Sequence, residues 1–195
     1  MKHSAQRNVG KLRIVGGTLR GSRIDVIDRD GLRPTSDRVR ETLFNWLAPI
    51  IEGARCLDLF AGTGALGIEA ISRGAAECTF IERDRDLARQ LETTLSRLKL
   101  ANARVVNADA MNWLNGSAQA FDLVFLDPPF AHDLWAAAAA RLESSGWLAT
   151  EASIHIESST GCVFALPLNW RLHREAQAGA VHFALYRRTP AIPLS

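Results

Sequence analysis

The chain has 195 residues, of which 47% are hydrophobic and 23% are charged, and these values are ordinary for a soluble globular protein. That length suits one domain with a sizeable core and a small extension. The sequence excludes a membrane-spanning protein, because no apolar run approaches the roughly 20 residues that a span needs. The polar start of the chain has no hydrophobic signal region behind it, so we expect a cytoplasmic protein.

The three cysteines, Cys56, Cys78 and Cys162, are an odd number without a paired spacing. Cys56 and Cys78 lie in apolar runs that are typical of buried strands, where a thiol packs as a small apolar group. We therefore expect neither a disulfide framework nor a metal site.

The net charge of +2 conceals an uneven distribution. Residues 1–40 contain ten Lys or Arg against four Asp or Glu, whereas the remainder contains thirteen against seventeen. A basic N-terminal region on a mildly acidic body indicates that this region faces a polyanion. Residues 1–11 themselves are expected to form a flexible basic tail.

A β-hairpin is predicted next, because the β-rich runs 12–15 and 23–27 flank a glycine-containing connection. The hairpin is positively charged because it contains three candidate RNA-binding residues, Arg13, Arg20 and Arg23. We take residues 12–31 as a basic hairpin extension of the main domain.

A helix is predicted to start in Pro34-Thr35-Ser36-Asp37, where Thr35 or Ser36 can cap the free N–H groups. Apolar residues then recur at helical spacing, which gives the helix one apolar face. Trp46 belongs to this face, so we expect it in the core rather than stacked on a base. The set is Val39, Leu43, Trp46, Leu47 and Ile50.

From Arg55 onward, strand and helix patterns alternate. The apolar strands and intervening helices predict a doubly wound α/β fold with a mostly parallel sheet. Its final strands lack a long helix between them and predict a terminal antiparallel hairpin. This catalytic domain is expected over 32–190, with a tail at 191–195. Strands are predicted at 55–60, 77–82, 103–107, 121–127, 152–158, 170–176 and 180–188, and helices at 65–73, 84–99, 109–115 and 132–144.

Residues 56–67 form a strand, a glycine turn and a helix start. Gly62 permits the tight turn, and Gly64 allows a ligand to approach the backbone closely. Glu82 closes the next strand, where an acid could accept hydrogen bonds from ribose hydroxyls. The same spacing is found in dinucleotide-binding domains, so a nicotinamide-dependent oxidoreductase is one alternative.

Two further acids favour a different cofactor. Asp58 ends the strand before the glycine turn, where its carboxylate would repel a pyrophosphate but suit an ammonium and a sulfonium group. Asp109 follows the third strand and could accept a hydrogen bond from an adenine amino group. Asp58, Glu82 and Asp109 thus follow successive strands, at the edge where open α/β sheets bind ligands. Acids that merely cap helices are the alternative for each one singly.

The strand 121–126 runs into Asp127-Pro128-Pro129-Phe130, where the prolines force the chain out of the sheet. A base amino group is a poor nucleophile, because its lone pair is delocalised into the ring. Asp127 and a proline-fixed carbonyl could accept its two hydrogens and stabilise the positive charge of the attacking nitrogen. Phe130 could stack on the extruded base and align it. The turn therefore predicts amino methylation of a base, although a simple strand-ending turn is the alternative.

These segments resemble the class I methyltransferases and, within them, the RsmD-type family of bacterial 16S rRNA guanine-N2 methyltransferases. The resemblance covers the chain from Leu12 to about Arg188. The most diagnostic piece is 32–47, Leu-Arg-Pro-Thr-Ser-Asp-Arg-Val-Arg-Glu-Thr-Leu-Phe-Asn-Trp-Leu. The others are the start of the hairpin at 13–17, the glycine loop at 58–67 and the turn at 127–130.

The resemblance implies a seven-stranded sheet whose last strand is antiparallel, and S-adenosylmethionine as the cofactor. It implies that the loop with Asp58, Phe60, Gly62, Thr63 and Gly64 holds the methionine part. Glu82 and Arg83 would lie at the ribose and adenine, Asp109 and Ala110 at the adenine, and the turn from Asp127 to Phe130 at the target guanine. Thr35 and Arg38 are weaker candidates for the cofactor carboxylate.

The family acts on 16S rRNA in the small ribosomal subunit, which would let Arg13, Arg20, Arg23 and Arg33 grip RNA phosphates. We expect a monomer. Arg83 departs from the family pattern, which usually has an apolar residue packed on the adenine there. Two alternatives remain: an N6-adenine methyltransferase of DNA or other RNA, and a non-catalytic RNA-binding assembly factor.

Overall fold

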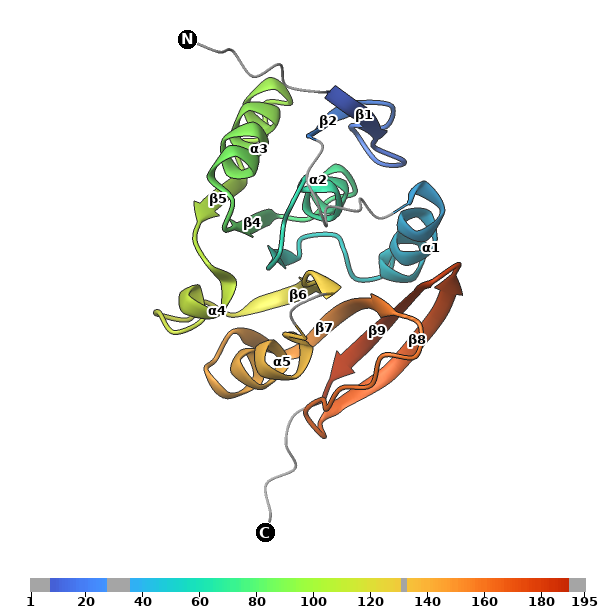
Figure 1. Ribbon diagram of the computed structural model, residues 1–195, viewed down its shortest axis with the longest axis vertical. Coiled ribbons are helices and arrows are strands. Elements are labelled where there is room, and N and C mark those ends of the chain that lie inside the picture. Colours follow the sequence, from blue (N-terminus) through green and yellow to red (C-terminus); the bar gives the residue numbers. More distant parts are fainter. Residues whose placement is uncertain (1–7, 28–35, 131–132, 190–195) are drawn as a thin grey trace.

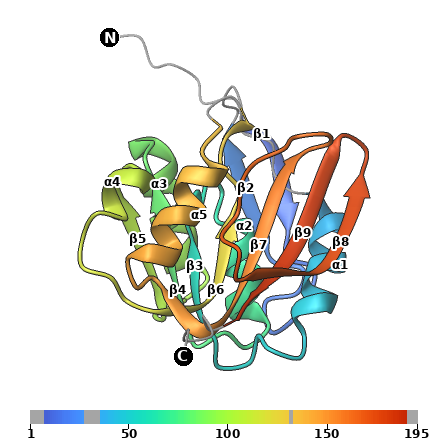
Figure 2. The ribbon, with the colours of Figure 1, turned by 90° about the horizontal axis from the view of Figure 1, so that it is seen from below.

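The computed structural model describes residues 8–27, 36–130 and 133–189, which build a seven-stranded sheet covered by helices on both faces (Figure 1). The sheet order is β5-β4-β3-β6-β7-β9-β8, which Figure 2 shows across the sheet. Strand β9 runs antiparallel to β7 and β8, and the other neighbouring strands pair in parallel, which confirms the predicted doubly wound sheet with an antiparallel last strand. The strands are β3 (Arg55–Asp58), β4 (Glu77–Glu82), β5 (Ala103–Asn107), β6 (Phe121–Leu126), β7 (Leu148–Ser159), β8 (Trp170–Ala178) and β9 (Val181–Arg188).

The two faces of the sheet bury separate apolar clusters. One face is covered by α1 (Asp37–Leu47), α2 (Ala65–Ser72) and α3 (Arg85–Arg97), and the other by α4 (Ala110–Trp113) and α5 (Trp135–Ser144) (Figure 1). Cys56 and Cys78 lie in the first cluster, and burial raises the pKa of both thiols. They are core thiols, as the sequence predicts. In the described part of the chain, no helix is long and apolar enough to cross a membrane.

Helix α2 packs very closely on the sheet because Gly67 has no side chain. A Cβ atom at Gly67 would lie 2.2 Å from Cε1 of Phe80 on β4. This is the helix–strand packing role of the third glycine in such loops. The tight contact fixes the start of α2 against β4.

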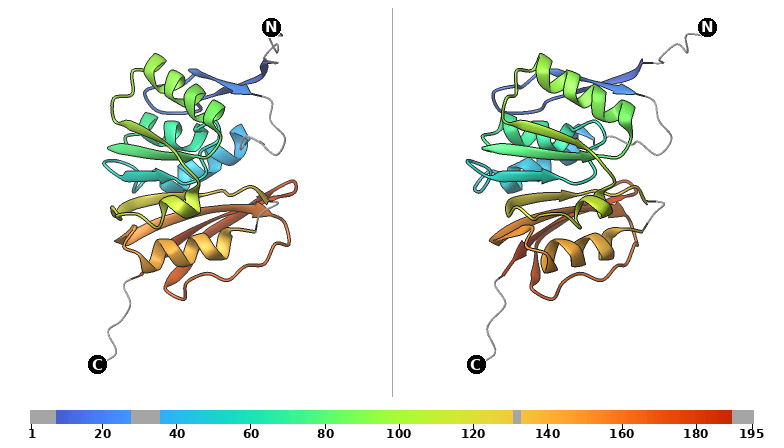
Figure 3. Two further views of the ribbon diagram at one scale, coloured as in Figure 1. Left: turned by 60° about the vertical axis from the view of Figure 1, so that its left-hand side comes forward. Right: turned by 90° about the vertical axis from the view of Figure 1, so that its left-hand side faces the viewer.

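The N-terminal hairpin consists of β1 (Asn8–Arg13) and β2 (Arg23–Ile27), which form a separate two-stranded sheet. It lies over α3, at the opposite end of the molecule from β8 and β9 (Figure 3). Strand β1 begins earlier than the predicted 12–15, because residues 8–11 pair with β2. It ends at Arg13, since the N–H groups of Val15 and Gly16 donate to the carboxylate of Glu69 and not to β2.

The start of α1 agrees with the predicted cap: the Ser36 hydroxyl accepts from the N–H of Val39 at 3.3 Å. Trp46 is half-buried and stacks on Phe183 of β9, with ring centroids 5.2 Å apart. It packs against the core, as expected.

Other element boundaries differ by a few residues from the predicted ones. Strand β3 stops at Asp58, because the next residues enter the glycine turn. Helix α5 starts at Trp135 and not at 132, since Asp133 has a positive φ of 44° that a helix does not accommodate. Strand β7 is longer than the predicted 152–158, and α4 is shorter than the predicted 109–115.

Candidate active site

The predicted cofactor and catalytic residues gather at one edge of the sheet. Asp58 and Glu82 end β3 and β4, Asp109 follows β5 and Asp127 follows β6. These four strands are parallel neighbours, so their carboxyl ends lie along the same edge. This is the edge at which open α/β sheets bind their ligands.

Asp58 is a deeply buried acid, with 3% of its surface exposed. Its Oδ2 accepts a hydrogen bond from the N–H of Gly67 at 3.1 Å. Burial nevertheless raises the pKa of Asp58 to about 7, and the charge of Glu82 adds to this shift. A buried carboxylate of this kind is stabilised by a cation, and an ammonium group would supply one.

Glu82 holds the glycine turn in place. Its Oε2 accepts from the N–H of Gly62 at 2.8 Å, and its Oε1 accepts from the N–H of Asp84 at 2.7 Å. Gly62 and Gly64 have φ values of 51° and 74°, which favour glycine. Burial raises the pKa of Glu82. The carboxylate thus has a structural role beside the predicted ribose contact, since each oxygen retains a second lone pair.

Phe60 and Thr63 are half-buried in the same turn. Gly64 is buried, and a Cβ atom there would lie 2.4 Å from Cδ1 of Leu91. The turn therefore leaves no space for a side chain at Gly64, and its backbone conformation is fixed by packing from α3.

The ends of β4 and β5 are joined by Asn107, a residue that no motif in the sequence indicates. Its side-chain amide donates to the carbonyls of Glu82 at 2.8 Å and Arg83 at 3.1 Å. Asp109 is exposed and caps α4 by accepting from the N–H of Asn112 at 3.0 Å, which is the alternative considered for it. Ala110 is buried behind it, and the side chain of Arg83 is exposed.

The Asp127–Phe130 turn leaves the sheet close to two other acids, Asp58 and Glu157. Asp127 has a pKa raised well above its ordinary value, first by burial and then by the charges of Glu157 and Asp58. Phe130 is 41% exposed, and its ring centroid lies 5.9 Å from that of Trp135. Pro128 is buried and Pro129 is half-buried, so the turn presents an acid and an accessible ring.

The remaining predicted residues are less well placed. Arg38 is exposed in the first turn of α1, and no described contact joins it to the strand ends. Thr35 and Arg33 lie outside the described residues. The side chains of Arg13, Arg20 and Arg23 are exposed, and the described part of the chain offers them no acidic partner.

A buried ion cluster fastens the hairpin to the body, and it was not foreseen from the sequence. Glu69 is fully buried on α2 and accepts from Val15, Gly16 and the guanidinium groups of Arg40 and Arg73. Arg40, also fully buried, donates to the Arg13 carbonyl at 2.7 Å and to Asp37 at 2.6 Å. The signal that could have shown it is a single acid within an otherwise uncharged helix.

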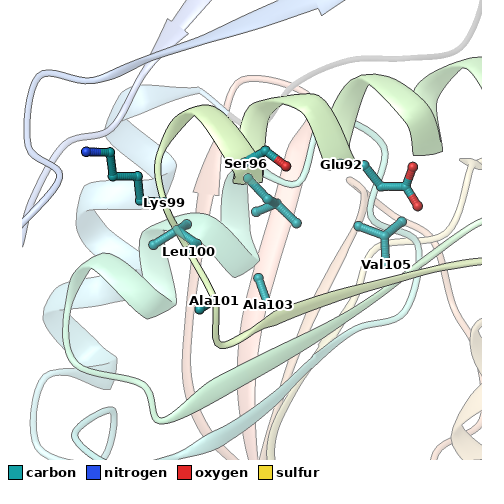
Figure 4. A pocket seen from close by; sticks show the side chains of 8 residues that line it. Glu92, Ser96, Lys99, Leu100, Ala101, Ala103 and Val105 are labelled. Atoms are coloured by element: carbon teal, nitrogen blue, oxygen red, sulfur yellow. The ribbon is translucent and has the colours of Figure 1, made fainter.

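A groove of about 540 Å³ lies between α3 and β5, away from the predicted cofactor and base site (Figure 4). None of the predicted site residues lines it. Within the described ranges, no group of three His, Cys, Asp or Glu is arranged to hold a metal ion. The groove is lined by Glu92, Leu95, Ser96, Lys99, Leu100, Ala101, Ala103 and Val105.

The chain is similar to known proteins along nearly its whole length. The family model of conserved hypothetical protein 95 matches residues 12–187. Ribosomal RNA small subunit methyltransferase D of Escherichia coli strain K12 is 51% identical over 189 residues, which are 96% of each chain.

Solved structures agree with this sequence similarity. A putative methyltransferase from Escherichia coli, YhhF, superposes with a TM-score of 0.86 at 52% identity, over 93% of this chain and 100% of that one. A putative methylase from Haemophilus influenzae gives a TM-score of 0.81 at 40% identity, over 92% and 99% of the two chains. With the family model, these relatives show that the chain belongs to the conserved hypothetical protein 95 family, the RsmD-type methyltransferases, and is a methyltransferase.

Proposed function

We propose that the protein transfers a methyl group from S-adenosylmethionine to the exocyclic N2 amino group of a specific guanine of 16S rRNA in the small ribosomal subunit. The observation that carries this proposal is the position of the Asp127–Phe130 turn beside Asp58, on one edge of the sheet. The relative that is 51% identical is named for methylation of small subunit ribosomal RNA, which supports the substrate.

The strand ends fit the proposed cofactor. When bound, S-adenosylmethionine supplies a methyl group on a positively charged sulfur, together with an ammonium group. Asp58 is a buried carboxylate that gains from a nearby cation, and it would hold the ammonium group. Glu82 would accept from the ribose hydroxyls, and Asp109 and Ala110 would hold the adenine. Phe60, Thr63 and the glycines of the turn would line the methionine part.

The residues of the turn would act on the base. Asp127 and a carbonyl of the Pro128-Pro129 segment accept the two amino hydrogens, which directs the nitrogen lone pair toward the methyl group. Phe130, which is 41% exposed, offers a face on which the extruded base stacks. The nitrogen becomes positively charged as it gains the methyl group. In its ionised form Asp127 would accept the surplus proton from this nitrogen.

Transfer of a labelled methyl group to small ribosomal subunits that lack the modification tests the proposal. Nucleoside analysis of the RNA should give N2-methylguanine, at one position. N6-methyladenine would contradict the proposed base, and label on naked DNA would contradict the proposed nucleic acid. A further part of the proposal is a cytoplasmic monomer. Measurement of the mass in solution checks the monomer, and fractionation of cells checks the location.

A further inference from the structure

Glu157 on β7 lies beside Asp127 across the β6–β7 pair. The register pairs Phe125 with His155 and Leu126 with Ile156, so the next residue of each segment, Asp127 and Glu157, continues the same row. Adjacent strands are about 4.8 Å apart. The two acids are therefore neighbours at the edge where the proposed base binds.

The two side chains also point to the same face of the sheet. Leu126 and Ile156 are buried in the cluster under α4 and α5. Side chains alternate along a strand, so Asp127 and Glu157 face the opposite side. Phe125 and His155, two residues before Asp127 and Glu157, lie on that same face and make an edge-on contact with ring centroids 6.1 Å apart. The influence of the Glu157 charge on the pKa of Asp127 agrees with this placement.

The main chain at Glu157 contacts Trp135, whose ring also lies against Phe130 of the turn. The main-chain carbonyl of Glu157 accepts from Nε1 of Trp135 at 2.8 Å. Only 5% of the surface of Glu157 is exposed. Two acids therefore lie side by side where the proposed base binds, and each carboxylate oxygen can accept more than one hydrogen bond.

Guanine presents a row of donors. Its N1–H and both N2 hydrogens lie side by side, whereas adenine places an acceptor, N1, next to its amino group. A carboxylate only accepts hydrogen bonds when ionised, so it attracts N1–H of guanine and repels N1 of adenine. Two neighbouring carboxylates therefore match guanine and disfavour adenine.

We propose that Glu157 is a specificity-determining residue that accepts the N1–H of the target guanine while Asp127 holds the N2 amino group. This inference rests on the proposed function, because it assumes a guanine bound at the Asp127–Phe130 turn. It assigns base selection to β7, outside the turn that carries the amino-methylation chemistry.

The test compares guanine with 2-aminopurine, which keeps the 2-amino group, lacks O6 and has an acceptor at N1. Small subunits are reconstituted with 16S RNA that carries either base at the position methylated in the first experiment. The native protein should prefer guanine by about 100-fold in kcat/KM, the scale of a hydrogen bond to a charged group. In Glu157→Gln the amide can accept or donate, so the preference should fall to below about 10-fold.

Glu151→Gln is the matched control, because Glu151 is an exposed acid near the start of the same strand. It should retain the full preference. Thermal unfolding and binding of S-adenosylhomocysteine show whether Glu157→Gln is folded. If that variant is unstable, the native comparison can still overturn the inference, which methylation of both bases at rates within about 3-fold would do. Glu157→Asp, which keeps the charge but shortens the side chain, then replaces it and should also lower the preference.

The outcome separates this inference from the proposed function. If the native protein makes no N2-methylguanine in small subunits, the proposed function fails. If it does so and Glu157→Gln keeps the native preference for guanine, only the role of Glu157 is contradicted.

Discussion

Asp58 and Asp127 lie at the ends of neighbouring strands, and the carboxyl groups of both bind protons more tightly than an exposed aspartate does. Their positions were predictable, because each stands between an apolar strand and a glycine or proline turn. Their pKa values were not, since burial and the charge of Glu157 depend on which strands become neighbours. Glu157 itself gave no signal, because it lies within an alternating strand whose partner is distant in sequence.

Replacing Asp127 tests its direct role in methyl transfer. In Asp127→Asn the side chain keeps its size but accepts hydrogen bonds less strongly, so kcat should fall by roughly 10²- to 10³-fold. Binding of S-adenosylhomocysteine, measured by calorimetry, should change little. Loss of cofactor binding together with activity would mean that Asp127 has a structural role.

Replacing Asp58 should stabilise the protein without cofactor while it weakens cofactor binding. The folded pKa of about 7 lies above the ordinary 3.8, so the native state holds a proton that the unfolded chain releases. The stability contribution of Asp58 is therefore full below about pH 4 and is lost as pH rises to about 7. Asp58→Asn avoids this loss, which is worth up to about 4 kcal/mol.

Urea unfolding of both proteins between pH 4 and pH 8 measures the Asp58 effect. The difference in the free energy of unfolding should grow with pH and then level off above about pH 7. A difference that is independent of pH would show that Asp58 ionises normally in the folded protein.

At the scale of elements, the hairpin was predicted but its attachment was not. The glycine connection and β-rich runs indicated β1 and β2 from local sequence. Glu69 and Arg40, which fasten the hairpin to α2 and α1, act through contacts more than 25 residues apart in the chain. The basic hairpin is consequently fixed to the body, so its arginines occupy defined positions.

Glu69→Gln should strongly destabilise this attachment. One carboxylate oxygen becomes an NH₂ group that faces existing donors, and the buried Arg40 loses its counter-charge. Breaking a buried pair in this way costs about 3–5 kcal/mol. Chemical unfolding gives the free energy, and hydrogen exchange should accelerate at residues 8–27. Glu41→Gln, an exposed change on α1, is the control and should have little effect.

The hairpin arginines should contribute to RNA affinity through phosphate contacts. Changing Arg13, Arg20 and Arg23 to Gln should reduce the slope of log affinity against log salt by roughly 2 to 3. The control changes three exposed arginines on β8 and β9, which are Arg171, Arg174 and Arg187. An equal reduction in the control would show that the hairpin has no special role.

At the scale of the whole molecule, the alternation of strands and helices was sufficient to predict the sheet and the edge that carries the site. Parallel strands with right-handed crossovers leave few arrangements, so the ends of β3, β4 and β6 fall together. The precise ends of elements were less predictable. Val15 and Gly16 donate to Glu69 and do not pair with β2, so β1 ends before them. The positive φ of Asp133 places the start of α5 after this residue.

Cofactor binding should stabilise the whole fold. S-adenosylhomocysteine at 100 times its Kd adds about 2.7 kcal/mol, which raises the Tm of a protein of this size by roughly 5–10 °C. NAD should give no shift. Differential scanning fluorimetry measures both, and an equal rise with NAD would contradict the cofactor assignment.

Strand β9, the last in the chain, is inserted between β7 and β8. The edge of β7 that carries Glu157 therefore stays unpaired during synthesis until residues 181–188 have left the ribosome. Folding of the proposed base site therefore has to wait until β9 has been synthesised. A nascent chain stalled before β9 would expose the edges of β7 and β8 that β9 covers, and exposed strand edges are preferred sites for aggregation and for chaperone binding.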